Sequence, residues 1–472
     1  MEINRRAGIL LAVSSLTRTK KTGALGKEAY AFVDFLAAAG QSFWQILPIG
    51  PANETLSPYQ SRSAFAFNTD FIDRNAIRKD PERYATKGPL YNRFLKDNAH
   101  WLNDYSLFEA VRASQGGKPL ALWSDDLRNP SSKTLALLSE KYKEEIEAEV
   151  KEQYLFFLQW RELKRYANLK GIGIIGDLPI YVYEDSADFW LRKKAFDIDK
   201  KGRPASSAGV PPDAFSKDGQ LWNNPVYDWD NNKKEVFALW RERLLQASRL
   251  YDGVRIDHFR AFADFYTVTL QQTSRGSKTE QPHSKKISAK NGEWKDGPGL
   301  AFTDMINKEF PGLFVIAEDL GNLSNKAKKL VKDCGFPGMS VIQFAFSGDS
   351  KNPYLPHNIK NNSVCYTGTH DNDTIAGWCS SLSGKELRFV MDYFGCSVAE
   401  ELPEILIAAV LASKADVAIL PLQDWLGLGS EARMNMPGTK GGSNWQWKIP
   451  KNALSSRLAS RIRHAVKDLY SR

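Results

Sequence analysis

The chain has 472 residues, of which 42% are hydrophobic and 25% are charged, so it can bury a large core. No stretch is apolar for long enough to cross a bilayer, which argues against a membrane partner. The formal net charge of +9 comes from scattered basic residues, and no basic motif is interleaved with aromatic residues. Nucleic acid is therefore not an expected partner.

The cysteines and the N-terminal segment indicate where the protein works. The four cysteines lie in the C-terminal half and form no C-x-x-C pair. This favours reduced thiols in a cytoplasmic protein over a disulfide framework or a zinc site. Arg5-Arg6 followed by an apolar run imitates a short signal peptide, but the run is brief and no clean cleavage site follows.

The first elements of the chain alternate between strand and helix. Residues 8–16 and 43–48 have the apolar character of buried strands. Between them, residues 27–39 have the pattern of an amphipathic helix that ends at Gly40. Strand, helix and strand in succession are typical of a parallel sheet.

The alternation stops at about residue 51. An irregular aromatic stretch is followed by segments of helical pattern at 105–114 and 132–168, which are rich in lysine and glutamate. Long insertions grow in the loops after barrel strands, where ligand-binding residues also lie. We therefore predict an insertion subdomain over about residues 51–168.

The alternation resumes near residue 172 and continues toward the C-terminus. We expect an irregular active-site loop insertion at about 208–229 and a solvated basic loop at 275–295. Helices are predicted at 235–250, near 301–309 and from 326. The predicted strands are 8–16, 43–48, 172–178, 253–259, 313–320, 340–346, 363–371 and 417–422. Eight strands that mostly alternate with helices indicate an α/β fold, a (β/α)8 TIM barrel with long insertions, as a single catalytic domain over residues 1–472.

Acidic residues mark the ends of four of these strands. Asp177, Asp257, Glu318 and Asp371 each follow a short apolar run, so a closed barrel would bring them to one pocket at its C-terminal face. Carboxylates gathered in one pocket repel, and at least one should have a raised pKa and serve as a proton donor. One protonated and one ionised carboxyl can cleave a glycosidic bond. The alternative is that each carboxylate caps a helix or pairs with a nearby arginine.

Three charged or polar neighbours adjoin these carboxylates. Arg255 lies two residues before Asp257, hence on the same face of a strand, where its charge would keep that carboxylate ionised. His258 and His370 could donate N–H groups to sugar hydroxyls, although a lone strand histidine is more often a satisfied core residue. A histidine–carboxylate metal site is another interpretation, but no ligand spacing such as H-E-x-x-H supports it.

No cofactor or metal is expected from the motifs present. The chain has no phosphate loop, no dinucleotide fingerprint and no EF-hand pattern.

Eight motifs together resemble those of one family. They occur in the expected order and cover nearly the whole chain: LPIGP (47–51), SPYQS (57–61), GDLPIYV (176–182), GVPPDAFSKDGQLW (209–222), VRIDHFR (254–260), AEDLG (317–321), TGTHDNDT (367–374) and SEARMNMPGT (430–439). This set is similar to the 4-α-glucanotransferases, also called amylomaltases or disproportionating enzymes, of the α-amylase clan.

The resemblance implies transfer of a segment of a 1,4-α-D-glucan to the 4-OH of an acceptor glucose or glucan. It implies that Asp257 is the nucleophile of a covalent glucosyl-enzyme and that Glu318 is the general acid and then the base. Asp371 would hold the ring hydroxyls of the distorted sugar. Such a retaining double displacement needs Asp257 and Glu318 about 5–5.5 Å apart. The glycosidic bond itself is the activated donor, so no nucleotide sugar is needed.

The same resemblance implies a set of substrate contacts. Ser57, Tyr59 and Gln60 would line the donor side, with Tyr59 stacked on the sugar. Asn435 would bind a donor glucose further out, and Asp177 would bind the cleavage-site sugar or support the catalytic aspartate. We count Arg255, His258 and His370 among the substrate-binding residues as well.

On the acceptor side the resemblance implies a flexible loop with Asp213, Phe215 and Trp222. Taken alone, its aromatic residues are as typical of loop packing as of sugar platforms. The family usually has a glycine after this tryptophan, whereas this chain has Asn223. Because asparagine tolerates a left-handed backbone, we expect the turn to be kept.

Transfer and hydrolysis share their first step and differ in what attacks the glucosyl-enzyme. A transferase must exclude water or position a sugar 4-OH far better than water. The two predicted insertions could cover the site, but the choice of a transferase rests on the resemblance. An α-amylase-like retaining glucan hydrolase is the alternative, and a non-catalytic glucan-binding barrel is a second.

Overall fold

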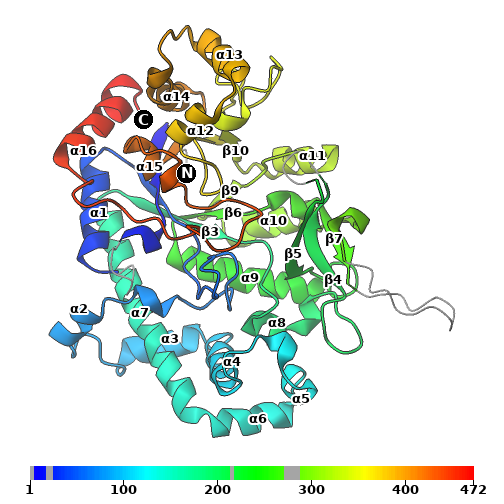
Figure 1. Ribbon diagram of the computed structural model, residues 1–472. Coiled ribbons are helices and arrows are strands. Elements are labelled where there is room, and N and C mark those ends of the chain that lie inside the picture. The colour runs from blue at the N-terminus through cyan, green and yellow to red at the C-terminus, as the bar shows by residue number, and fades with distance from the viewer. Residues whose placement is uncertain (1–4, 17–24, 213–216, 271–286) are drawn as a thin grey trace, which may run out of the picture.

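The structure, a computed structural model (Figure 1), describes residues 5–16, 25–212, 217–270 and 287–472. Its central element is a sheet of eight parallel strands in the order β10-β11-β12-β1-β2-β3-β6-β9. The strands are β1 (Arg6–Leu10), β2 (Phe43–Gln45), β3 (Gly173–Leu178), β6 (Gly253–Ile256), β9 (Phe314–Ala317), β10 (Gly338–Val341), β11 (Ser363–Tyr366) and β12 (Val417–Pro421). Each overlaps one of the eight predicted strands, and the predicted barrel is confirmed.

The two end strands of this sheet nearly close the barrel. Ala317, the last residue of β9, donates its backbone N–H to the Pro337 carbonyl at 2.9 Å. The Met339 N–H in β10 donates to the Asp319 carboxylate at 2.7 Å. The Asp319 side chain, directly after β9, therefore links β9 to β10, where the backbone hydrogen bonds between these two strands are incomplete.

Most of the barrel strands end earlier than predicted, although β3 ends at Leu178 as expected. β6 ends at Ile256 and β11 at Tyr366, so Asp257 and Asp371 lie on the loops just beyond their strands. Two residues after β6, His258 has a left-handed backbone with φ of 48°, which prevents the extended conformation from continuing past Asp257. The first predicted strand, 8–16, contains only residues 8–10 of β1 and a separate 3-10 turn at Val13–Leu16.

Helices cover the outside of the barrel. In α1 (Lys27–Ala38), Phe32, Val33 and Leu36 are buried, and the chain leaves the helix at Gly40, where φ is 68°. The predicted helices α9 (Lys233–Leu250), α10 (Leu300–Glu309) and α11 (Asn325–Cys334) are also present. The remaining helices of the barrel region are α8 (Ala187–Leu191), α12 (Ile375–Ser381), α13 (Gly384–Phe394), α14 (Leu402–Ala412), α15 (Leu422–Trp425) and α16 (Ser456–Arg463).

The long connection between β2 and β3 is mostly helical, and its helices lie close to one another in the lower part of Figure 1. Its helices are α2 (Arg74–Lys79), α3 (Pro89–Asp97), α4 (Leu102–Ser114), α5 (Asp125–Arg128), α6 (Ser132–Lys141) and α7 (Lys143–Leu169). Two aromatic residues hold the long α7 in place. Phe156 stacks on Phe67 with ring centroids 4.6 Å apart, and Trp160 Nε1 donates a hydrogen bond to the Leu250 carbonyl at 3.0 Å. The division of this region into a subdomain stays a prediction.

A second, antiparallel sheet corrects two predictions. The order of its strands is β5-β4-β7-β8, namely β5 (Gln220–Pro225), β4 (Ser206–Val210), β7 (Asp264–Thr269) and β8 (Glu293–Asp296). Residues 208–210 and 220–225 of the predicted irregular segment 208–229 thus belong to paired strands, and the end of the predicted loop 275–295 is a strand. The residues of β5 and β8 lack apolar alternation, and their pairing with distant strands stabilises them. Residues 271–286 lie outside the described part.

Apolar side chains fill the inside of the barrel. Leu10, Ile175, Ile316, Tyr366 and Ile419 belong to one buried cluster contributed by strands from all around the sheet. Within the described residues, no helix combines the length and the hydropathy needed to span a membrane.

Candidate active site

Asp177 and Arg255 form the buried base of the site. They face each other on neighbouring strands, because β3 and β6 pair in the register Asp177 with Arg255. The Arg255 guanidinium donates two hydrogen bonds to the Asp177 carboxylate, at 3.1 and 2.8 Å, and one to Asp257 Oδ1 at 2.8 Å. The Asp177 side chain is 0% exposed, whereas that of Asp257 is 29% exposed. Arg255 therefore links a buried carboxylate to one that solvent can reach.

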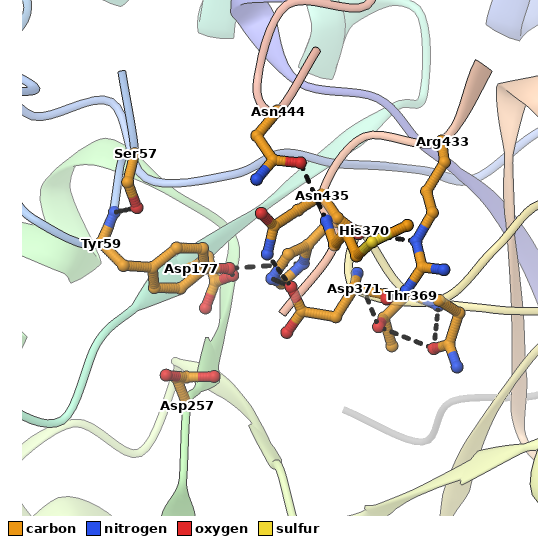
Figure 2. A network of polar contacts seen from close by, with 12 residues as sticks. Ser57, Tyr59, Asp177, Asp257, Thr369, His370, Asp371, Arg433, Asn435 and Asn444 are labelled. Atoms are coloured by element: carbon orange, nitrogen blue, oxygen red, sulfur yellow. Dashed lines mark hydrogen bonds and ion pairs between the residues drawn. The ribbon is translucent and has the colours of Figure 1, made fainter. Parts of the chain in front are cut away.

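Tyr59 covers this pair from the loop after β2. Its hydroxyl donates to Asp177 Oδ2 at 2.5 Å and accepts from Arg255 at 3.1 Å. Burial raises the pKa of Tyr59 well above its usual value, so the hydroxyl stays protonated. Its ring stacks on His370, with centroids 5.0 Å apart (Figure 2). One aromatic side chain thus connects the ends of β3 and β6 with the loop after β11.

Glu318, directly after β9, is held by two backbone groups. Its Oε2 accepts from the His258 N–H at 2.7 Å, and its Oε1 accepts from the Leu320 N–H at 3.0 Å. The left-handed backbone of His258 turns this N–H toward the carboxyl of the neighbouring strand. The position of Glu318 is therefore set by the backbone that follows Asp257.

The carboxyls of Asp257 and Glu318 titrate together. Burial and the charges of Asp177, Glu318 and Asp371 raise the pKa of Asp257, while Arg255 lowers it. Burial also raises the pKa of Glu318, against the effects of Arg255 and the two backbone N–H groups. Interacting carboxyls share protons as a pair. Burial raises the pKa of Asp257 to about 8, and the direct bond from Arg255 acts against burial by stabilising its ionised form.

Asp371 is oriented by the segment near the C-terminus (Figure 2). Its Oδ1 accepts from Asn435 Nδ2 at 2.6 Å and lies 3.5 Å from His370 Nε2. The Arg433 guanidinium donates to the Asp371 backbone carbonyl at 2.6 Å and to the Asn435 carbonyl at 2.8 Å. The Asp371 side chain is 47% exposed, so its carboxylate is held in place yet open to solvent.

Both histidines are neutral, and His370 is buried whereas His258 is partly buried. Burial lowers the pKa of His258 to about 3 and lowers the pKa of His370 from its usual 6.5. A neutral imidazole offers one N–H donor and one acceptor. Trp222 on β5 packs edge-on against the His258 ring, with centroids 4.9 Å apart. Asn223 has the expected left-handed backbone, with φ of 59°, but it lies within β5, where the pairing with β4 is irregular.

Two of the remaining predicted substrate-binding residues lie near Tyr59, and two lie outside the described residues. Ser57 and Gln60 lie in the same loop as Tyr59, where Ser57 Oγ accepts from the Tyr59 N–H at 3.4 Å and Gln60 Oε1 accepts from Asn53 Nδ2 at 3.0 Å. Asp213 and Phe215 lie outside the described residues.

Sequence reasoning missed two residues of this site. Arg433, which lies inside the quoted motif at 430–439, was given no role, and its bonds to the Asp371 and Asn435 carbonyls were not foreseen. Trp445 packs against both Tyr59 and His370, with ring centroids 5.8 Å apart in each case. A cluster of asparagine and tryptophan residues at 444–447 was the signal that could have indicated it.

Replacing Arg255 by methionine is expected to destabilise the protein and reduce its activity. The Arg255 side chain is 3% exposed, and its loss leaves Asp177 and Asp257 without their cation. Breaking a buried ion pair in this way costs about 3–5 kcal/mol of unfolding free energy. Urea denaturation would measure it. Arg93→Met is the control and should change stability by less than about 0.5 kcal/mol, because Arg93 and its partner Asp97 are 79% and 37% exposed. Equal urea concentrations at the unfolding midpoint of the two variants would contradict the expectation.

Comparison with known proteins identifies the family. The family model described as 4-alpha-glucanotransferase matches residues 11–88 and 74–454. The 4-alpha-glucanotransferase of Clostridium butyricum is 39% identical over 95% of this chain and 97% of its own length. The chloroplastic/amyloplastic enzyme DPE1 of Arabidopsis thaliana is 38% identical over 100% of this chain and 86% of its own.

A solved structure agrees with these sequence matches. The amylomaltase of Streptococcus agalactiae, in complex with acarbose, has a TM-score of 0.89 and 34% identity, and covers 99% of both chains. The family model and the relatives thus match nearly the whole chain, and the function they share is that of a glycosyltransferase rather than a hydrolase. The chain therefore belongs to the family of 4-alpha-glucanotransferases, which act on α-1,4-glucans.

Proposed function

We propose that Asp257, Glu318 and Asp371 carry out the transfer by retaining double displacement. Asp257 Oδ attacks the anomeric carbon while Glu318 gives its proton to the glycosidic oxygen, and the shortened glucan leaves. The Glu318 carboxylate then takes the proton of an acceptor 4-OH, whose oxygen attacks the anomeric carbon and releases Asp257. The observation that carries this assignment is the Arg255 bond to Asp257, because a guanidinium bonded to this carboxylate favours the ionised form that a nucleophile needs.

The backbone N–H groups on Glu318 suit a group that alternates between acid and base. They favour the ionised form, and burial favours the protonated form. The two influences oppose each other, so the carboxyl can give up its proton in the first step and regain one in the second.

Asp371 is proposed to grip the ring hydroxyls of the sugar at the cleavage point. The bonds from Asn435 and from the Arg433 side chain hold it before substrate arrives, so little ordering is needed when the sugar binds. His370 lies beside it, and as a neutral imidazole it can donate to or accept from a hydroxyl.

One side of the site is proposed to bind the donor glucan, and the other side is proposed to bind the acceptor. Ser57, Tyr59, Gln60, Asp177 and Asn435 would bind the donor glucan. Trp222 with Asp213, Phe215 and His258 would bind the acceptor, for which both glucose and maltooligosaccharides qualify. The contact of Trp222 with His258 supports this division, because it places Trp222 beside the residue that follows Asp257, whereas Tyr59 contacts Asp177 and His370.

The product profile from maltotriose tests the proposed function. Transfer without net hydrolysis yields glucose together with longer maltooligosaccharides, and the total number of reducing ends stays constant. Chromatography of the products and a reducing-sugar assay would measure both quantities. A steady rise in reducing ends without longer products would indicate a hydrolase, and unchanged maltotriose would indicate a binding protein.

The pH dependence of transfer is expected to be bell-shaped. At low pH the Asp257–Glu318 pair holds two protons, and Asp257 cannot attack; at high pH it holds none, and Glu318 cannot protonate the leaving oxygen. Because both pKa values are raised, from 3.8 and 4.5, both limbs lie at higher pH than for two isolated carboxyls. The ratio kcat/KM for maltotriose, measured from about pH 4 to about pH 10, would give the two limbs. A loss of activity on the alkaline side that begins near pH 5 would contradict this assignment.

We also propose a cytoplasmic location. The four cysteines are free thiols, three of them buried, which suits a reducing compartment. Fractionation of cells that express the protein would test this location.

A further inference from the structure

Trp445 has an unusual backbone beside the site. Its φ is 65°, although bulky side chains disfavour the left-handed region. Its N–H donates to the Met434 carbonyl at 2.7 Å, and the side chain of the preceding Asn444 accepts from the Met436 N–H at 3.0 Å. The ends of the segment 434–445 are therefore tied together, and these bonds hold Trp445 in its strained conformation.

The Trp445 ring belongs to an aromatic group on one side of the site. It contacts Tyr59 and His370, with centroids 5.8 Å away in both cases, and these two rings stack on each other. Figure 2 shows His370 between Tyr59 and Asp371. The Trp445 side chain is half-buried, and it packs against the apolar cluster inside the barrel. Part of the ring thus remains open beside two residues of the site.

Strained residues persist where the surrounding structure holds them, and they gather at ligand sites. A glycine or an asparagine would adopt this backbone with little strain, and either would leave the same turn. What the tryptophan adds is an apolar face for the C–H groups of a glucose ring and an indole N–H for a hydroxyl.

We propose that Trp445 is a substrate-contacting residue that binds the donor glucan next to Tyr59. The inference rests on the proposed function, in which Tyr59 and Asn435 lie on the donor side. The Trp445 ring contacts Tyr59 and His370, whereas Trp222 contacts His258. Trp445 therefore acts on the first half-reaction, in which the donor is bound and cleaved, and not on recognition of the acceptor.

Two variants separate this role from simple packing. Trp445→Gly removes the ring and relieves the backbone, and Trp445→Phe keeps an aromatic ring. The assay follows exchange of labelled glucose into maltotriose, with donor and acceptor varied in turn. We expect the KM for maltotriose to rise about tenfold in Trp445→Gly and to recover in part in Trp445→Phe, while the KM for glucose stays unchanged.

The matched control is Asn452→Gly, an exposed position with a similar left-handed backbone (φ of 60°), which should leave both KM values unchanged. The inference is overturned if Trp445→Gly keeps the wild-type KM for maltotriose, or if both KM values change equally. If Trp445→Gly does not fold, Trp445→Phe decides: an unchanged KM for maltotriose and unchanged acarbose affinity reject the inference. If wild-type protein makes no longer products, the proposed function fails, and titration of the variants with acarbose still tests the contact.

Discussion

Asp257→Asn is expected to abolish transfer while the fold and glucan binding persist. The amide cannot form the covalent bond to the anomeric carbon, and removing the nucleophile of a covalent mechanism lowers kcat by at least about 10⁴-fold. The asparagine oxygen can still accept the hydrogen bond that Arg255 gives to Asp257 Oδ1 at 2.8 Å. The geometry around Asp177 should therefore be kept.

The measurement combines the maltotriose assay with titration of acarbose, which the Streptococcus agalactiae amylomaltase binds. Asp257→Asn should bind acarbose and turn over no maltotriose. Asp296→Asn, at an 81% exposed carboxylate, is the control and should retain full activity. Residual transfer above about a hundredth of the wild-type rate would exclude Asp257 as the nucleophile.

Glu318→Gln is expected to show the second largest loss, and one that depends on the donor. Without an acid, the glycosidic oxygen must leave unprotonated, and transfer from maltotriose should fall about 10³-fold. A glucosyl fluoride donor needs no protonation, so the first step should remain fast. Glutamine can keep only one of the two backbone bonds, from His258 or Leu320, with its single oxygen.

Rapid mixing of Glu318→Gln with α-glucosyl fluoride should give a burst of fluoride equal to the enzyme concentration. Slow turnover should follow, because the acceptor 4-OH lacks its base in the second step. The alkaline limb of the pH profile should also disappear for this donor, since the group that ionises there has been removed. The absence of a burst, with fluoride release as slow as transfer from maltotriose, would assign the acid to another residue.

The barrel could be predicted because its strands have a strong local pattern. Segments such as 172–178 and 417–422 are short apolar runs, and buried parallel strands have this character. The antiparallel sheet could not be predicted in the same way. The residues of β8, Glu293–Asp296, are mostly charged, and this segment is a strand because it pairs with β7. Pairing with a distant partner, rather than local preference, decides such strands.

The carboxylates of the site were predicted from their positions after apolar runs, and their partners were not. Asp177 and Arg255 are 78 residues apart, and only the register of β3 with β6 brings them together. The bond from Asn435 to Asp371 spans 64 residues and depends on the path of the C-terminal segment. The roles of these residues in catalysis stay predictions until the variants are measured.

The sequence by itself determined the alternation of strands and helices, the placement of Asp257, Glu318 and Asp371 at strand ends, and the resemblance to the glucanotransferases. Only the tertiary structure decided that Arg255 is shared between Asp177 and Asp257, that the left-handed His258 directs its N–H to Glu318, and that Trp445 reaches Tyr59. The physical reason is that periodicity and turn chemistry act over a few residues, whereas these contacts depend on strand register and loop path across the whole barrel.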